Sequence, residues 1–135
     1  MTYLVERLAE LRRHLDHLRA LRSRVSAQAL AADLSLHNDV LFSLLMVCQL
    51  VIDLAGELSA RRGMPFEDYR QAVRNLSGMN LVAPGTVAAL ERLPGFRNVL
   101  VHEYVALDLE RAVEAMDQLG PVEEMFRAVH RLLAD

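Results

Sequence analysis

The 135-residue sequence contains no lysine, a single cysteine and few aromatic residues. The lone cysteine, Cys48, excludes an internal disulfide, and we interpret it as a buried, reduced thiol of a cytosolic protein. Aromatic residues make up 5% of the chain, whereas 53% of the residues are hydrophobic, mainly Leu, Ala, Val and Met. Unbranched side chains lose little rotamer freedom in a helix, while aromatic residues favour strands. The composition therefore favours an all-helical chain.

The sequence also lacks a segment suited to secretion or to crossing a membrane. Its N-terminus has no basic stretch followed by an apolar block, so we expect no signal peptide. The most apolar run, residues 40–55, is interrupted by Ser43, Gln49 and Asp53, which favours a buried core helix over a bilayer span. A chain of this length suits one domain, and we expect a single domain over residues 1–135, in the cytoplasm and without membrane association.

Charge is unevenly distributed along the chain. The net charge of −3 argues against a protein that coats nucleic acid without regard to sequence. Residues 1–32 nevertheless carry six arginines against three acids, whereas residues 101–135 carry eight acids against three arginines. The basic first segment could contact RNA phosphates or an acidic partner. We favour a third interpretation, a solvated helix face.

Two long helices are predicted in the first half of the chain. Apolar residues at three- and four-residue steps predict a helix from Thr2 to about Ala29. Asp33 or Ser35 is expected to cap a second helix that runs to about Arg62, with Gly63 as its stop. Because its middle is apolar nearly all round, the second helix is expected to be the central one.

Shorter helices are predicted in the second half. One starts at Met64-Pro65, with an inner face of Phe66, Tyr69, Val73 and Leu76, and ends before a turn at residues 77–80. Another opens at Pro84, breaks or kinks at Pro94-Gly95 and resumes over 96–105. Asp108 is expected to cap the last helix, which kinks at Gly120-Pro121 and ends near Ala134. No strand pattern is present, so we predict an all-α, up-and-down bundle of four to five helices.

One segment groups polar side chains capable of chemistry. At about 100° per residue, Arg97, Asn98, His102 and Tyr104 share one broad arc of a helix. Histidine moves protons near neutral pH, and arginine clamps a phosphate and stabilises charge that develops on it. The predicted break at Pro94-Gly95 would also place Arg97 near a helix start, where free N–H groups favour an anion. This set suits cleavage of RNA, whose own 2′-OH is the nucleophile. Geometry alone, however, favours a solvated or subunit-facing surface.

The motif and its flanks resemble a known family. Residues 95–104 read Gly-Phe-Arg-Asn-Val-Leu-Val-His-Glu-Tyr and resemble the signature of the HepT-like toxins, which are ribonucleases with a HEPN domain. Their motif is an arginine, four to six residues, a histidine, one residue and a tyrosine, with a polar residue after the arginine. Length, helix order and a central helix bearing residues 49–54 ahead of a Pro-initiated helix also fit. The resemblance covers essentially the whole chain and implies a HEPN-like fold.

The resemblance implies a function and partners. It implies a metal-independent endoribonuclease toxin without a cofactor, acting as a homodimer that brings two motifs to a shared cleft. Arg97 and His102 would be catalytic, with His102 as general base or acid, and Asn98 would support them. A minimal nucleotidyltransferase antitoxin would silence the toxin by adding AMP to Tyr104. The alternative is a non-catalytic helical module that binds a nucleotidyltransferase, or that restrains it as an antitoxin.

Polar residues outside the motif leave further alternatives open. Gln49, Asp53 and Glu57 lie at four-residue steps on one side of the predicted central helix. Asp53 either supports the site, by pairing with Arg97 or orienting His102, or belongs to a polar edge. We favour the polar edge for Glu57.

Two histidines near the N-terminus raise the question of a metal. His14 and His17 lie one turn apart beside Asp16. Two ligands without a third are weak grounds for a metal site, so we favour a solvated face.

Overall fold

The computed structural model describes residues 2–135, with the backbone but not the side chain of Tyr104. These residues form helices only, with no strand among them, which confirms the all-α expectation. The elements are α1 (Thr2–Leu21), η1 (Arg22–Arg24), α2 (Ala27–Ala32), α3 (Leu34–Arg61), α4 (Tyr69–Arg74), η2 (Asn75–Met79), α5 (Pro84–Leu90), α6 (Leu93–His102), η3 (Tyr104–Ala106), α7 (Leu109–Asp117) and α8 (Gly120–Ala134).

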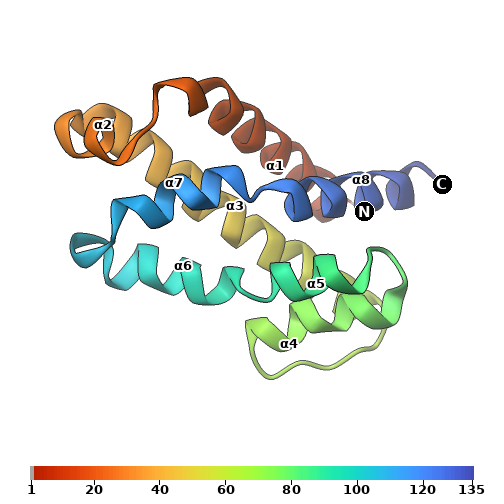
Figure 1. Cartoon of the computed structure of the whole chain (residues 1–135). Coiled ribbons are helices and arrows are strands. Elements are labelled where there is room, and N and C mark those ends of the chain that lie inside the picture. Colours follow the sequence, from red (N-terminus) through yellow and green to blue (C-terminus); the bar gives the residue numbers. More distant parts are fainter. Residues whose placement is uncertain (1) are drawn as a thin grey trace.

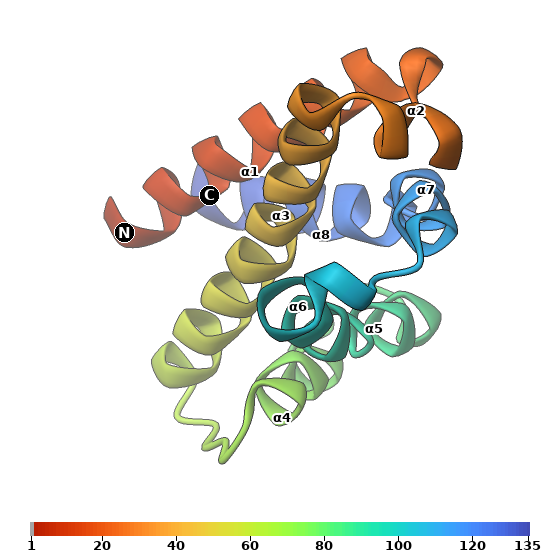
Figure 2. The same cartoon turned by 90° about the vertical axis from the view of Figure 1, so that its left-hand side faces the viewer.

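The helices form a bundle around α3. In Figure 1, α5 and α6 follow one another along one line, and α7 and α8 follow one another along a second. Helix α1 packs against α3 and α8, while α3 also contacts α6 and α7, and α5 contacts α8. The long helical segments of the bundle are thus α1, α3, α5–α6 and α7–α8, and α2 and α4 are short helices beside them (Figures 1 and 2). This arrangement confirms the predicted bundle.

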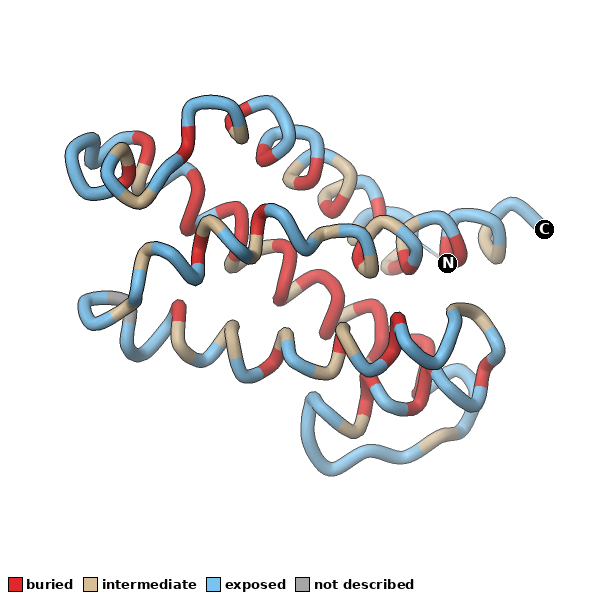
Figure 3. Tube along the Cα trace, in the orientation of Figure 1, coloured by how far each residue is buried: buried red, intermediate tan, exposed pale blue. Residues whose placement is uncertain are grey.

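Helix α3 is the core helix. Its N-cap Asp33 accepts a hydrogen bond from the Leu36 N–H, and it ends just before Gly63, whose φ of 66° is left-handed, as predicted. By length and composition α3 could also cross a membrane, but most of its apolar stretch is buried inside this fold. Figure 3 shows the buried positions following α3 through the middle of the bundle. The interpretation of residues 40–55 as a core helix is therefore confirmed.

The first predicted helix is interrupted. Helix α1 ends at Leu21, and Ser26 adopts an extended backbone with φ −146° and ψ 165°. The Ser26 hydroxyl accepts a hydrogen bond from the Ala29 N–H at 3.0 Å and so caps the separate helix α2. A single helix to Ala29 is therefore wrong, because serine offers the backbone a cap that competes with helix continuation. The predicted apolar stripe, from Leu4 to Leu18, is buried.

The third helix begins later than predicted. Asp68, with an extended backbone, accepts a hydrogen bond from the Gln71 N–H at 2.7 Å and caps α4, so residues 64–68 are not helical. Val73 and Leu76 are buried as expected, whereas Phe66 and Tyr69 are 38% and 47% exposed. The predicted inner face is thus wrong for its two aromatic members.

The helix that carries the motif starts earlier and ends earlier than predicted. Pro84 opens α5 as expected, but the break falls just before Leu93 rather than at Pro94-Gly95. Pro94 sits in the first turn of α6, where its missing N–H costs nothing. Helix α6 ends at His102 instead of Val105. The predictions that Asp108 caps α7 and that the last helix breaks near Gly120 are confirmed.

The basic and acidic segments of the chain bind each other. Both terminal nitrogens of Arg12 on α1 donate to the Glu123 carboxylate on α8, at 2.9 and 2.8 Å, and Arg19 donates to it at 2.8 Å. Arg22 contacts Asp117 on α7 at 2.6 Å. Arg12 holds the pKa of Glu123 below its ordinary value. These arginines therefore stabilise the bundle. The sequence favoured a solvated face for them, and that interpretation is incomplete.

Candidate active site around Arg97

Helix α6 presents the motif along one edge of the bundle. Leu100 is buried, and Leu93 and Phe96 pack against the core, which fixes the rotation of the helix. Arg97 follows Phe96 and is half-buried at the boundary with α3, whereas Asn98 and His102 are exposed. Asn98 and His102 are four residues apart and so neighbour each other on the helix surface. The motif therefore lies at the junction of core and solvent.

Arg97 is held by a residue of α3. Its Nε donates to the Oε1 atom of Gln49 at 3.0 Å, and its Nη1 donates to the Oδ1 atom of Asn98 at 3.3 Å. A guanidinium has five N–H groups, so three of those on Arg97 donate to no described side chain. A half-buried guanidinium that is fixed on one side and open on the other suits an anion.

Asp53 acts on Arg97 only through Gln49. The Gln49 Nε2 atom donates to the Asp53 carboxylate at 2.8 Å. A carboxylate only accepts, so it directs the amide N–H₂ toward itself and leaves the amide oxygen for Arg97. Among the described residues, no ion pair joins Asp53 to Arg97 or to His102, so the expected direct contact is not formed. Gln49 thus links Asp53 to Arg97, whereas the sequence predicts only that it shares one side of the helix with Asp53.

The end of α6 separates the motif into two parts. His102 is its last residue, about 7.5 Å along the axis from Arg97. Tyr104 begins the 3₁₀ helix η3, so the single-helix arc does not extend to it, and its side chain lies outside the described part of the chain. Because the Phe96 N–H already donates to the Arg92 carbonyl, Arg97 lies in the second turn. The backbone N–H of Arg97 is therefore not one of the free N–H groups at a helix start, contrary to the expectation from the sequence.

Cys48 is excluded as a nucleophile. The side chain is 2% exposed, and burial raises the pKa of its thiol to about 12, although the positive charge of Arg97 acts in the opposite direction. A thiol with this pKa carries almost no thiolate at neutral pH. The interpretation of Cys48 as a buried thiol is confirmed.

The histidines of α1 pair with residues of α3. The Nδ1 atom of His14 lies 2.9 Å from the Ser43 hydroxyl, and burial lowers the pKa of His14. The Nε2 atom of His17 lies 3.2 Å from the Asp39 carboxylate. Over residues 2–135, no three His, Cys, Asp or Glu side chains are grouped as metal ligands.

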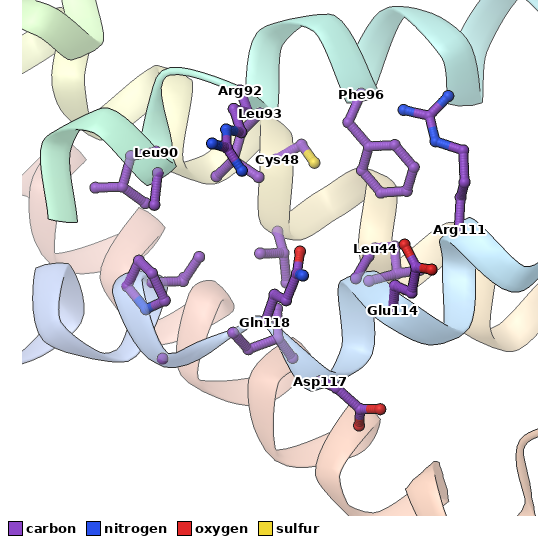
Figure 4. A pocket seen from close by; sticks show the side chains of 17 residues that line it. Leu44, Cys48, Leu90, Arg92, Leu93, Phe96, Arg111, Glu114, Asp117 and Gln118 are labelled. Carbon is purple, nitrogen blue, oxygen red and sulfur yellow. The ribbon is translucent and has the colours of Figure 1, made fainter. Parts of the chain in front are cut away.

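A cleft of about 500 Å³ lies on another side of α6 (Figure 4). Leu44 and Cys48 of α3 and Phe96 of α6 line it, together with residues of α7 and the start of α8. The Arg111 guanidinium lies 5.7 Å from the centre of the Phe96 ring. Arg97, Asn98 and His102 do not line this cleft, so the motif faces a different surface.

Comparison with known proteins places the chain in a family. The family model described as Ribonuclease HepT-like matches residues 11–129. The mRNA nuclease HepT of Shewanella oneidensis is 28% identical over 86 residues, which cover 62% of this chain and 64%, less than two thirds, of that relative.

Solved structures share the fold. A structure of a tri-AMPylated Shewanella oneidensis HEPN toxin in complex with an MNT antitoxin matches with a TM-score of 0.83 at 20% identity, over 97% of this chain and 98% of that chain. A toxin–antitoxin structure with AMP-PNP matches with a TM-score of 0.81 at 20% identity, over 96% and 98% of the two chains. Since the family model spans from α1 into α8, the chain belongs to the Ribonuclease HepT-like family.

Proposed function

We propose that this chain is a cytoplasmic, metal-independent endoribonuclease whose site is formed by Arg97, Asn98 and His102. The observation that carries this proposal is the anchoring of Arg97 by Gln49, with three N–H groups left for a phosphate. An exposed imidazole follows on the same helix. Family membership and the printed activity of the Shewanella relative, an mRNA nuclease, support it.

The proposed reaction is attack of the RNA 2′-OH on the adjacent phosphorus. His102 removes the hydroxyl proton as general base, the 2′-oxygen bonds to phosphorus and the bond to the 5′-oxygen breaks. The leaving 5′-oxygen takes a proton from an acid, either an imidazolium or water. Arg97 stabilises the charge that develops on the phosphoryl oxygens, and Asn98 braces Arg97 through its side-chain oxygen. The products are a 2′,3′-cyclic phosphate and a free 5′-OH.

A homodimer would bring two copies of this site together. Val101 is 40% exposed and Val105 86% exposed, on either side of His102 in the sequence. Apolar side chains at the surface favour a protein contact. A two-fold contact through this surface would place two His102 side chains near one cleft, so that one acts as base and the other as acid.

Control by a nucleotidyltransferase completes the proposal. The solved relative is a tri-AMPylated toxin in complex with an MNT antitoxin. By analogy, a minimal nucleotidyltransferase antitoxin adds AMP to Tyr104, two residues after His102. An AMP group there would add negative charge and bulk next to the site where the RNA phosphate binds.

The nature of the product ends tests the reaction. Purified protein should cut an unpaired RNA oligonucleotide in the presence of a metal chelator and leave 2′,3′-cyclic phosphate and 5′-OH ends, detected by mass spectrometry. Products with 5′-phosphate ends, or cleavage that stops when metal is removed, would contradict the mechanism. Expression of the chain alone should arrest host growth, whereas harmless expression of unmodified protein would support the alternative of a non-catalytic binding module.

A further inference from the structure

Two aromatic side chains near the start of α4 are exposed instead of packing in the core. Phe66 is 38% exposed and Tyr69 is 47% exposed. The chain has only four Phe and three Tyr residues. Phe66 belongs to the connection between α3 and α4, and Tyr69 is the first residue of α4. In Figure 2 this connection and α4 lie below α6 and beside the lower end of α3. The bundle leaves these two rings without a full core contact.

Tyr69 is the aromatic neighbour of the anchored arginine. The Cζ atom of Arg97 lies 6.0 Å from the centre of the Tyr69 ring. The guanidinium is fixed by Gln49, so α3 and α6 set the position of the arginine, while α4 carries the tyrosine. If Arg97 binds an RNA phosphate, the base of the same or the adjacent nucleotide would therefore lie near the Tyr69 ring.

Phe66 extends the same surface along α3. A Cβ atom on Gly56 would lie 3.5 Å from the Cζ atom of Phe66, so the ring rests over this glycine. Gly56 follows Gln49 and Asp53 at helical positions that share one face of α3. The two rings thus continue the line of side chains that supports Arg97.

Exposed arginines in this segment favour a nucleic acid over an apolar ligand. Residues 61–70 carry three arginines and two acids. Arg62 and Arg70 are exposed, and neither makes an ion pair with an acid among the described residues. Aromatic rings beside arginines are the surface on which unpaired bases stack, because every base has a π-face.

We propose that Tyr69, with Phe66 beyond it, forms a stacking subsite for an unpaired nucleobase next to the phosphate that Arg97 binds. The assignment of that phosphate to RNA rests on the proposed function. The subsite makes unpaired RNA the substrate class, since a base within a duplex has its faces covered by its neighbours. It also makes Tyr69 a positioning residue that sets which phosphate lies before His102.

Binding measurements test the subsite separately from cleavage. The protein carrying His102→Ala is titrated with a fluorescent, unpaired RNA oligonucleotide, and the same titration is repeated with Tyr69→Ala or Tyr69→Phe added. Tyr69→Ala should raise Kd about tenfold, whereas Tyr69→Phe should keep affinity within about twofold, because the ring is what stacks. Tyr3→Ala is the matched control, since the Arg7 guanidinium lies 3.9 Å from that ring on α1. Circular dichroism verifies the fold of each variant.

An abasic scan distinguishes stacking from other roles. RNAs with a single abasic residue at successive positions are bound to proteins with and without Tyr69→Ala. One position should weaken binding to the parent about tenfold and have no further effect in Tyr69→Ala, because both changes remove the same stack. Equal abasic effects in both proteins at every position would overturn the subsite.

Three further outcomes are separable. If Tyr69→Ala binds RNA like the parent but changes the sedimentation coefficient, the rings serve a protein contact and the proposal is wrong. If the parent binds RNA through Tyr69 but cuts none, the proposed function fails while the subsite stands. If RNA is cut and Tyr69→Ala changes neither KM nor Kd, the subsite alone fails.

Discussion

The Nε atom of Arg97 donates to the Oε1 atom of Gln49 over 3.0 Å, across the junction of α6 and α3. The amide of Gln49 has no freedom to turn, since its nitrogen already donates to Asp53 at 2.8 Å. The central core helix thus fixes the orientation of the residue that we assign to phosphate binding. A side chain held in this way loses little entropy when an anion arrives.

Loss of this anchor should impair catalysis more than binding. Gln49→Leu removes the acceptor for Arg97 and is expected to lower kcat about tenfold with a smaller change in KM, because the guanidinium is no longer aligned with the transition state. Gln49→Glu keeps an acceptor oxygen for Arg97 but cannot donate to Asp53 and places a second carboxylate beside it, so it should recover the activity only in part. Steady-state kinetics on an unpaired RNA gives both parameters.

Glu57→Gln is the control for the Gln49 variants. Glu57 lies two turns further along α3 and pairs with Arg61 at 3.0 Å, away from Arg97. It should leave kcat within about twofold of the parent, since an exposed ion pair of this kind contributes little. If Gln49→Leu behaves like Glu57→Gln, the anchor has no catalytic role.

The ion pair between Arg12 and Glu123 should make the stability depend on pH. Because Arg12 lowers the pKa of Glu123 in the fold, the folded chain binds fewer protons than the unfolded chain as acid is added. The stabilisation is present in full above the ordinary glutamate pKa of about 4.3 and is lost as the pH falls through the lowered value. Urea unfolding of Glu123→Gln should show a loss of about 1–2 kcal/mol at neutral pH.

The same variant also tests whether the ion pair is the cause of this loss of stability. The difference between Glu123→Gln and the parent should shrink toward zero in acid, because the parent carboxylate is then protonated as well. A difference that stays constant from neutral pH into acid would mean that the pair is not its cause. Glu10→Gln, which removes a partner of exposed Arg13, should cost less than about 0.5 kcal/mol at any pH.

The control proposed at Tyr104 predicts a defined mass change. Coexpression with a minimal nucleotidyltransferase encoded by an adjacent gene should add one or more AMP units to the chain and abolish RNA cleavage. Tyr104→Phe should remain unmodified and active under the same conditions, since it lacks the acceptor oxygen. Intact-mass and peptide analysis distinguish the cases, and full inhibition of unmodified parent protein would remove AMPylation from the account.

The sequence predicted those elements whose ends carry their own signals. Asp33 and Gly63 bound α3, Pro84 opens α5 and Asp108 caps α7, because each residue supplies or removes a local backbone contact. Ser26 and Asp68 supply similar caps but lie inside apolar patterns that favoured longer helices. Periodicity alone does not reveal which of two compatible local structures the bundle will select.

The motif itself was found from the sequence, whereas its surroundings were not. Arg97 and Asn98 are adjacent in the chain, so their contact is local. The anchor to Gln49 crosses 48 residues and depends on the rotation of α6 against α3. The sequence pattern places Tyr69 on the inner face of a helix, because an aromatic residue at helical spacing is usually buried. Its exposure follows from the late start of α4.

The most direct test of the proposed mechanism is the single-turnover cleavage of an unpaired RNA in the presence of a metal chelator. Arg97→Ala and His102→Ala should each lower the cleavage rate at least about 100-fold, because one removes the phosphate clamp and the other the proton acceptor. Arg13→Ala and His37→Ala, which change an exposed residue on α1 and a half-buried residue on α3, should cut at about the parental rate. Parental rates for both Arg97→Ala and His102→Ala would contradict the account.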